Sequence, residues 1–239
     1  MEWLCHFLRR RTAMCVVLVA ALLSPVRASA SALFYGFNNV FSGTDPASTS
    51  LPWVTMLVQD MASGTVSLTI SNAALTGSEF LGEFDFNLNP GLNPTNLQFT
   101  FATESGGFNL PSISLKENGA KADGGGYYDI SFGFGTADGT RFTVGDYVTC
   151  QITSPGLTAS DFNYLSAPSG GHGPFYAATH VQGIGVGGSN SGWISATQVT
   201  PVPVIPVPEP GTFAIAVCGL TGLLVMRRRF ADIRPKTKE

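Results

Sequence analysis

Tyr128-Asp129-Ile130-Ser131-Phe132-Gly133-Phe134 is the stretch that decides the fold of this 239-residue chain. Its bulky apolar side chains fall on every second residue, and small or polar residues separate them. Successive side chains of a β-strand point to opposite faces of a sheet. The pattern therefore predicts a strand with one apolar face, because the apolar residues of a helix would recur every three or four positions.

The same alternation recurs on both sides of this stretch. Glycine- and proline-containing breakers separate the repeats, and no segment between residues 31 and 200 shows a sustained helical period. About ten short strands of this kind predict an all-β fold, namely an antiparallel β-sandwich of jelly-roll-like type. We also expect Asp138-Gly139 to form a tight hairpin turn, because both residues tolerate positive φ. The clear strand segments are 66–70, 84–88, 97–101 and 148–152, and the weaker ones are 32–40, 53–59, 113–117, 177–186 and 193–199.

The phase of each strand predicts which side chains enter the core. Cys150 alternates with Val148 and Ile152, so we expect its thiol to be buried and inert. No other cysteine lies between residues 31 and 200, so no disulfide is expected there. In the segment 83–88 the alternation predicts a dry face and a solvent-facing side; the dry residues are Phe84, Phe86 and Leu88, and the wet ones are Glu83, Asp85 and Asn87.

The beginning of the chain has the order of a secretory signal peptide. Arg9-Arg10-Arg11 precedes an apolar stretch at 12–23, and Pro25 and Ala28-Ser29-Ala30 follow it. A basic region, an apolar region and an Ala-x-Ala end together predict cleavage after Ala30 by signal peptidase. Residues 1–30 are thus the expected signal peptide, the secretory translocon is an expected partner, and the segment 31–200 is the expected exported domain.

The end of the chain predicts a stalk and one membrane span. Prolines alternate through residues 201–208, which favours a semi-rigid polyproline II stalk. Residues 211–226 carry no charge, and a helix over them would be ~24 Å long at ~1.5 Å per residue. Arg227, Arg228 and Arg229 follow directly and can snorkel, and the positive-inside rule keeps residues 227–239 cytoplasmic. A buried core helix is the alternative interpretation of this segment.

The motif before the span carries a family resemblance. Pro208-Glu209-Pro210-Gly211, the apolar run and the arginine cluster together resemble, over residues 208–230, the sorting signal of PEP-CTERM proteins. The resemblance implies processing by an exosortase, a membrane-embedded enzyme. It also implies passage from the inner membrane to the bacterial cell surface or extracellular matrix.

A second segment resembles the closing part of many PEP-CTERM ectodomains. Residues 176–184 contain the run Ala-Ala-Thr-His-Val-Gln-Gly, and Gly192-Trp193-Ile194 follows; the relatives commonly have Ala-Ala-His-Val-Gln-Gly and then Ser-Gly-Trp-Ile. Thr179 interrupts the likeness. This resemblance supports a single domain over residues 31–200 and implies no substrate. From the residues alone, His180 and Trp193 are expected to pack in the core or at a strand edge.

The net charge of the expected exported domain, residues 31–200, excludes nucleic acid as a partner. Between residues 31 and 200, twelve Asp and Glu residues face three Lys and Arg residues, which leaves an excess of nine negative charges. The basic ends conceal this excess in the whole-chain value of −3. Such a surface repels phosphates, so nucleic acid is not an expected partner.

The sequence contains no recognisable catalytic constellation. Motifs of zinc proteases, serine hydrolases, phosphate-binding loops and dinucleotide-binding folds are missing from it. We therefore expect no enzyme activity, no catalytic residue, no cofactor and no metal. Three weaker hypotheses stay open: a metal held by His172 and His180, calcium at Asp123 with Asp129, and a glycosidase pair among Glu79, Glu83 and Asp85.

Together these features predict an exported surface or exopolysaccharide-associated protein whose ectodomain is structural or adhesive. Extracellular polysaccharide is a further candidate partner. The first alternative is a carbohydrate-binding module, which would need an exposed row of aromatic side chains. The second is a polysaccharide-active enzyme, which would need paired carboxylates in one cleft. The aromatic candidates are Trp53, Tyr127, Tyr128, Tyr147, Tyr164, Tyr176 and Trp193.

Overall fold

The structure is a computed structural model that describes residues 31–203. The expected signal peptide, sorting motif, membrane span and cytoplasmic tail lie outside these residues. Within residues 31–203, no helix has the length and apolar character needed to cross a membrane. The described chain forms twelve strands and three short 3-10 helices, η1 Pro94–Asn96, η2 Ala159–Phe162 and η3 Val186–Gly188.

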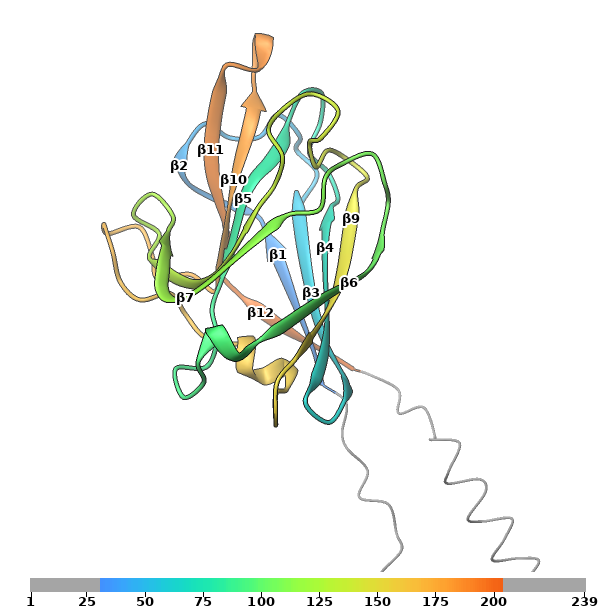
Figure 1. The fold of residues 1–239 in the computed structure, drawn as a ribbon. Coiled ribbons are helices and arrows are strands. Elements are labelled where there is room, and N and C mark those ends of the chain that lie inside the picture. The colour runs from blue at the N-terminus through green and yellow to red at the C-terminus, as the bar shows by residue number, and fades with distance from the viewer. Residues whose placement is uncertain (1–30, 204–239) are drawn as a thin grey trace, which may run out of the picture. The chain divides into compact units, whose positions relative to one another are not determined.

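The strands form two antiparallel sheets of six strands each, as Figure 1 shows. Sheet A has the order β12-β1-β3-β4-β9-β6, and sheet B has the order β2-β11-β10-β5-β8-β7. The all-β prediction is therefore confirmed. The strand bounds are β1 Ala32–Phe37, β2 Asn39–Gly43, β3 Val54–Ala62, β4 Thr65–Asn72, β5 Phe80–Phe86, β6 Gln98–Glu104, β7 Ser112–Lys121, β8 Tyr127–Gly133, β9 Tyr147–Thr153, β10 Ala177–Ile184, β11 Asn190–Ala196 and β12 Val199–Val202.

The main core lies between the two sheets and is rich in phenylalanine. Phe37 of sheet A packs on Phe84 of sheet B with ring centroids 5.0 Å apart, and Phe99 packs edge-on against Phe132 at 5.7 Å. Phe132 is fully buried, as the alternation in residues 128–134 predicts. Cys150 is also buried in this core, as predicted, and burial raises the pKa of its thiol to about 12. The thiol is therefore protonated and unreactive at neutral pH.

Two connections differ from the sequence predictions. The segment 32–40 is split at Asn38, with β1 in sheet A and β2 in sheet B. The Asp138-Gly139 turn does form, with Gly139 at φ +77, but it lies in the long link between β8 and β9, which belong to different sheets. Gly139 alone of the two residues has a positive φ, and a turn of this kind does not specify which strands pair beyond it.

The first two residues of the expected stalk, 201 and 202, belong to a strand. β12 runs to Val202, so Pro201 pairs with Leu33 and Val202 with Ala32. Proline is tolerated here because β12 is the edge strand of sheet A, where a missing N–H can face solvent.

The outer face of sheet B is partly covered, so two of the three residues predicted to face solvent in the segment 83–88 are buried, whereas Glu83 is partly exposed. A second apolar cluster sits on this face, formed by Ala122, Tyr128 and Ala178 with Phe41, Ala120 and Trp193 packed against it. Asp85 is fully buried and Asn87 is 3% exposed. The prediction was wrong because alternation reports which side chains share a face, whereas the cover comes from segments distant in sequence.

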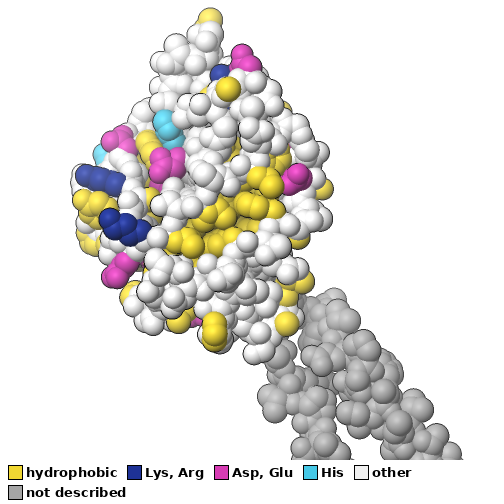
Figure 2. All heavy atoms as spheres, viewed as in Figure 1, with side chains coloured by type: hydrophobic (Ala, Val, Ile, Leu, Met, Phe, Trp, Pro, Cys, Tyr) yellow, Lys and Arg dark blue, Asp and Glu magenta, His cyan; other side chains and the backbone are white. Residues whose placement is uncertain are grey.

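A band of partly exposed apolar side chains marks the open side of the sandwich. β6 and β7 are the last strands of their sheets, and Figure 2 shows hydrophobic side chains gathered between them. Strand β7 limits edge pairing through charged residues and an irregular stretch in which Asn118 has φ +50. The partly buried residues packed on the core here include Leu92, Phe99, Phe101, Phe108, Ile113 and Leu115.

Burial separates two phenylalanines that the sequence pattern ranks equally. Phe132→Ala should lower the free energy of unfolding by about 3–5 kcal/mol, because it leaves a cavity between the sheets. Phe99→Ala should cost clearly less, since its ring is partly exposed on edge strand β6. Thr100→Ala, an exposed neighbour, is the control and should cost less than about 1 kcal/mol. Equal losses for Phe132 and Thr100 in urea melts would contradict the assigned faces.

Candidate functional site

A shallow depression lies on the covered, outer face of sheet B. Its volume is about 610 Å³. Strand β11 contributes one wall, the turn after β7 contributes the second, and the loop between η2 and β10 contributes the third. The lining residues are Lys121, Asp123, Gly124, Gly170, His172 and Trp193.

The β10–β11 hairpin supplies the central aromatic pair. His180 on β10 is the direct cross-strand partner of Trp193 on β11, so both side chains project from the same face. Their rings stack with centroids 4.9 Å apart and an angle of 15° between planes. Both residues are partly exposed. The expectation of core or strand-edge packing holds in part for Trp193, which packs against the second apolar cluster, but the pair lies on the outer face of the sheet and not in the main core.

Two further rings extend the pair into a row. Phe41 lies 6.3 Å from Trp193 and 6.2 Å from His172, measured between ring centroids. Phe41 reaches this face because of a shift in the pairing of β2 with β11. Trp193 pairs with Ser42, and the next residue, Ile194, pairs with Val40. The bulge leaves Phe41 as the extra residue and redirects its side chain. We call His172, Phe41, Trp193 and His180 the ring row.

Backbone contacts hold the two loops that wall the depression. His172 donates its backbone N–H to the carbonyl of Gly124 at 3.1 Å. Gly124 and Gly170 both have φ near +80, and a Cβ on Gly170 would lie 2.4 Å from the Gly124 Cα. Glycine is required at this crossing because any side chain would push the two loops apart.

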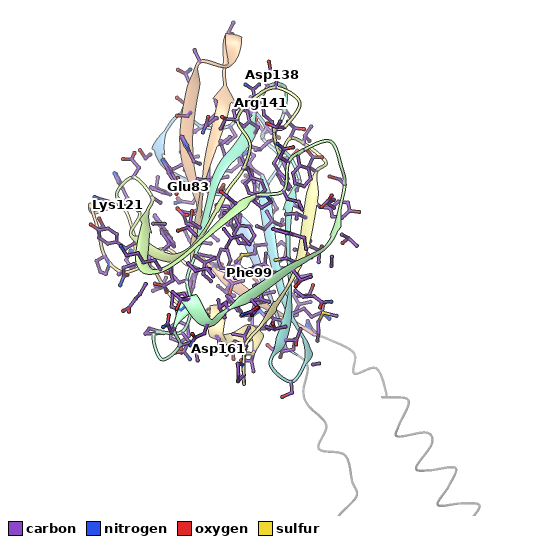
Figure 3. All side chains as sticks on the ribbon, viewed as in Figure 1. Glu83, Phe99, Lys121, Asp138, Arg141 and Asp161 are labelled. Carbon is purple, nitrogen blue, oxygen red and sulfur yellow. The ribbon has the colours of Figure 1, made fainter. Side chains whose placement is uncertain are left out.

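The polar groups at the rim carry both signs of charge. Asp123 accepts a hydrogen bond from the Ser42 hydroxyl, which ties the turn after β7 to strand β2. Lys121 places its ammonium 5.6 Å from the centre of the Tyr127 ring. Figure 3 shows Lys121 and Glu83 on the same flank of the molecule, with Phe99 nearer the middle of the view.

His180 is held neutral in a defined tautomer. Burial lowers the pKa of its imidazole, and the nearby Asp123 carboxylate opposes this shift more weakly. The side-chain amide of Gln182 lies 3.3 Å from His180 Nδ1. Since an amide nitrogen only donates, Nδ1 accepts and the neutral ring carries its proton on Nε2.

Asp85 is the buried acid beneath this face. Burial raises its pKa to about 8, and the charge of Glu83 on the same strand face adds to the rise. Ser131 lies close enough to lower the pKa slightly, but its hydroxyl donates to Glu83 at 3.3 Å. Neither Asp85 carboxyl oxygen has a hydrogen-bond partner among the described residues. The carboxyl group is therefore mostly protonated at pH 7.

The other site residues predicted from sequence are scattered. Glu79 is buried, and its carboxylate accepts the backbone N–H groups of Ala47 and Thr76 at 2.6 and 2.9 Å, so it fastens a loop. Asp129 accepts from the backbone of Leu88 and Asn118, whereas Asp123 binds Ser42. Among residues 31–203, no group of three or more His, Cys, Asp or Glu side chains is arranged to hold a metal ion.

The aromatic candidates separate into buried and isolated residues, with Trp193 as the exception. Trp53 and Tyr128 are buried, and Tyr176 is partly buried against the core. Tyr127, Tyr147 and Tyr164 are exposed, but no ring–ring contact joins them to one another in the described part of the chain. Sequence reasoning missed Phe41 and the contribution of Lys121, since nothing local indicates that β2 and the turn after β7 meet β11.

The signal-cleavage residues Ala28 and Ala30, the sorting motif Pro208 to Gly211 and the arginines Arg227 to Arg229 all lie outside the described residues. No protein-family model, curated protein or solved structure matches the chain.

The buried Asp85 carboxyl predicts a pH dependence of stability. Between about pH 4 and pH 8 the unfolded chain releases this proton and the folded chain keeps it. Stability is therefore greatest below pH 4 for this group and falls as the pH rises toward 8, by up to about 1.4 kcal/mol per pH unit. Asp85→Asn, which imitates the protonated acid, should flatten this part of the profile in urea melts from pH 5 to 8. Parallel profiles for the two proteins would contradict the assignment.

Proposed function

We propose that the chain is an exported surface or extracellular-matrix protein, sorted through its C-terminal motif and carrying a structural or adhesive ectodomain. The order of Pro208-Glu209-Pro210, the uncharged run 211–226 and Arg227 to Arg229 is the observation that carries the proposal. Signal peptidase and the translocon act at Ala28 and Ala30, and an exosortase-type enzyme reads the C-terminal motif. The ectodomain has no catalytic role in this proposal.

The way the described domain begins and ends supports attachment at one pole. Ala32 of β1 pairs with Val202 of β12, so the chain enters and leaves the sandwich side by side. Figure 1 has the tip of the β10–β11 hairpin at the opposite end from these two strands' outer ends. A domain tethered after β12 would thus present the tip of that hairpin away from the strand ends that join the tether, with the depression on its flank, where Figure 3 labels Lys121. The repeated crossings between sheets A and B suit the proposed jelly-roll-like topology.

The chemistry of Glu209 gives the sorting proposal its mechanism. Flanking prolines favour an extended backbone at this residue, which projects its carboxylate away from the chain. A charge beside a short apolar segment is costly for membrane insertion. That cost is offset when a cationic group in a membrane enzyme pairs with the carboxylate, so Glu209 serves as the recognition group.

Glu209→Gln tests this role, because it keeps size and polarity and removes the charge. In a host that contains the processing enzyme, the variant should accumulate as an unprocessed membrane form and fail to reach the surface. Glu117→Gln, an exposed glutamate of β7, is the matched control and should be processed normally. Normal tail removal in the Glu209 variant, measured by mass and cell fractionation, would refute the sorting role.

A further inference from the structure

We propose that the depression beside Trp193 binds an uncharged sugar ring of a polysaccharide. This proposal deepens the adhesive role proposed above. It rests on that role only for the place where the protein would encounter a polysaccharide, namely the cell surface or extracellular matrix. Three independent features support it. Two of them, the ring row and the mixed polar rim, lie on this face, and the third is the charge of the whole domain.

The ring row provides the apolar contact that a pyranose needs. One face of a sugar ring presents C–H groups, and an aromatic side chain such as tryptophan offers a large, rigid partner surface at low entropic cost. Trp193 is partly exposed and lines the depression. His180 stacks on it at 4.9 Å, and Phe41 packs beside it at 6.3 Å, so the indole is held in one orientation before any ligand arrives. Preorganisation of this kind improves affinity.

The rim provides the hydrogen-bonding groups that sugar hydroxyls require. Asp123 offers carboxylate oxygens as acceptors, and Lys121 offers an ammonium donor on the same turn. His172 adds an exposed imidazole from the opposing loop. Donors and acceptors around an aromatic surface suit a ring that bears several hydroxyl groups, each of which both donates and accepts.

Charge decides between neutral and acidic polymers. The described domain carries nine more acidic than basic residues, and Glu83 and Asp123 lie on the face that bears the depression. A uronic-acid or sulfated polymer would approach against this field, whereas a neutral glycan would not. One lysine at the rim does not reverse the balance. The favoured ligand is therefore a neutral hexose polymer.

The experiment uses the full chain purified in detergent, with an array of neutral hexose oligosaccharides and matched uronic-acid oligosaccharides as probes. Calorimetry then gives the dissociation constant for the best neutral member. We expect Trp193→Ala to weaken binding at least about tenfold, and Trp193→Phe to weaken it less because an aromatic face is kept. Lys121→Ala, an exposed position, should weaken binding without lowering the melting temperature. Asp123→Ala should also weaken binding, and because it removes the hydrogen bond from Ser42 its melting temperature is measured beside it.

Tyr147→Ala is the matched control, because Tyr147 is an exposed aromatic residue on sheet A, 41% exposed. It should leave the dissociation constant unchanged. The proposal is overturned if no neutral oligosaccharide binds, if uronic-acid probes bind more tightly, or if Tyr147→Ala and Trp193→Ala have equal effects. Since these measurements use binding alone, their failure leaves the sorting role of Glu209 untouched.

Discussion

The burial of sheet B on both faces is the constraint on which the rest of the structure depends. Its inner face packs on sheet A, and on its outer face Tyr128 of β8 and Ala178 of β10 are buried in a cluster with Ala122 from the turn after β7. Tyr128 shows how firmly this cover is held, because its hydroxyl donates to the Gly125 carbonyl and burial raises its pKa. Ser166 from the other loop donates to the same carbonyl at 2.9 Å. The two walls of the depression thus meet on one acceptor.

This cover also sets the chemistry of the polar groups beneath and beside it. Asp85 loses water without gaining a hydrogen bond, so its carboxyl stays protonated well above the usual range. A buried acid without a hydrogen-bond partner reduces the stability of the fold. Groups with strongly shifted pKa values are commonly found at functional sites. Trp193 and His180 lie at the margin of the same cover, where part of each ring stays accessible. The depression lies between the two loops that wall it and Trp193 of β11.

Sequence periodicity predicted the strands well and their surroundings poorly. Ile130 and Phe132 of β8 and residues 148, 150 and 152 of β9 face the main core as expected, because a period of two follows directly from strand geometry. Tyr128 shares their phase but packs in the second cluster. The same reasoning failed for Asp85, whose cover comes from segments such as 120–128 that lie far along the chain. It also missed the break at Asn38 and treated residues 32–40 as one strand, since alternation continues through a crossover between sheets.

The candidate site was only partly accessible to sequence reasoning. His180 and Trp193 stood out in a segment with a family resemblance, yet their stacking depends on a register that the sequence does not state. Phe41 joins them through a bulge, and bulges leave no local signature here. Lys121 is the last residue of β7, an edge strand of sheet B, and Asp123 lies in the turn that follows it. Each of these placements is a consequence of topology.

The most direct test of the account is the titration of the Asp85 carboxyl carbon, observed by NMR in protein labelled at aspartate and assigned with Asp85→Asn. If the outer face of sheet B is dry, the resonance should titrate with a midpoint near pH 8. A midpoint near pH 4, typical of a hydrated aspartate, would show that water reaches this face. The assignment of a dry outer face to sheet B would then be wrong, and so would the placement of the depression beside that face.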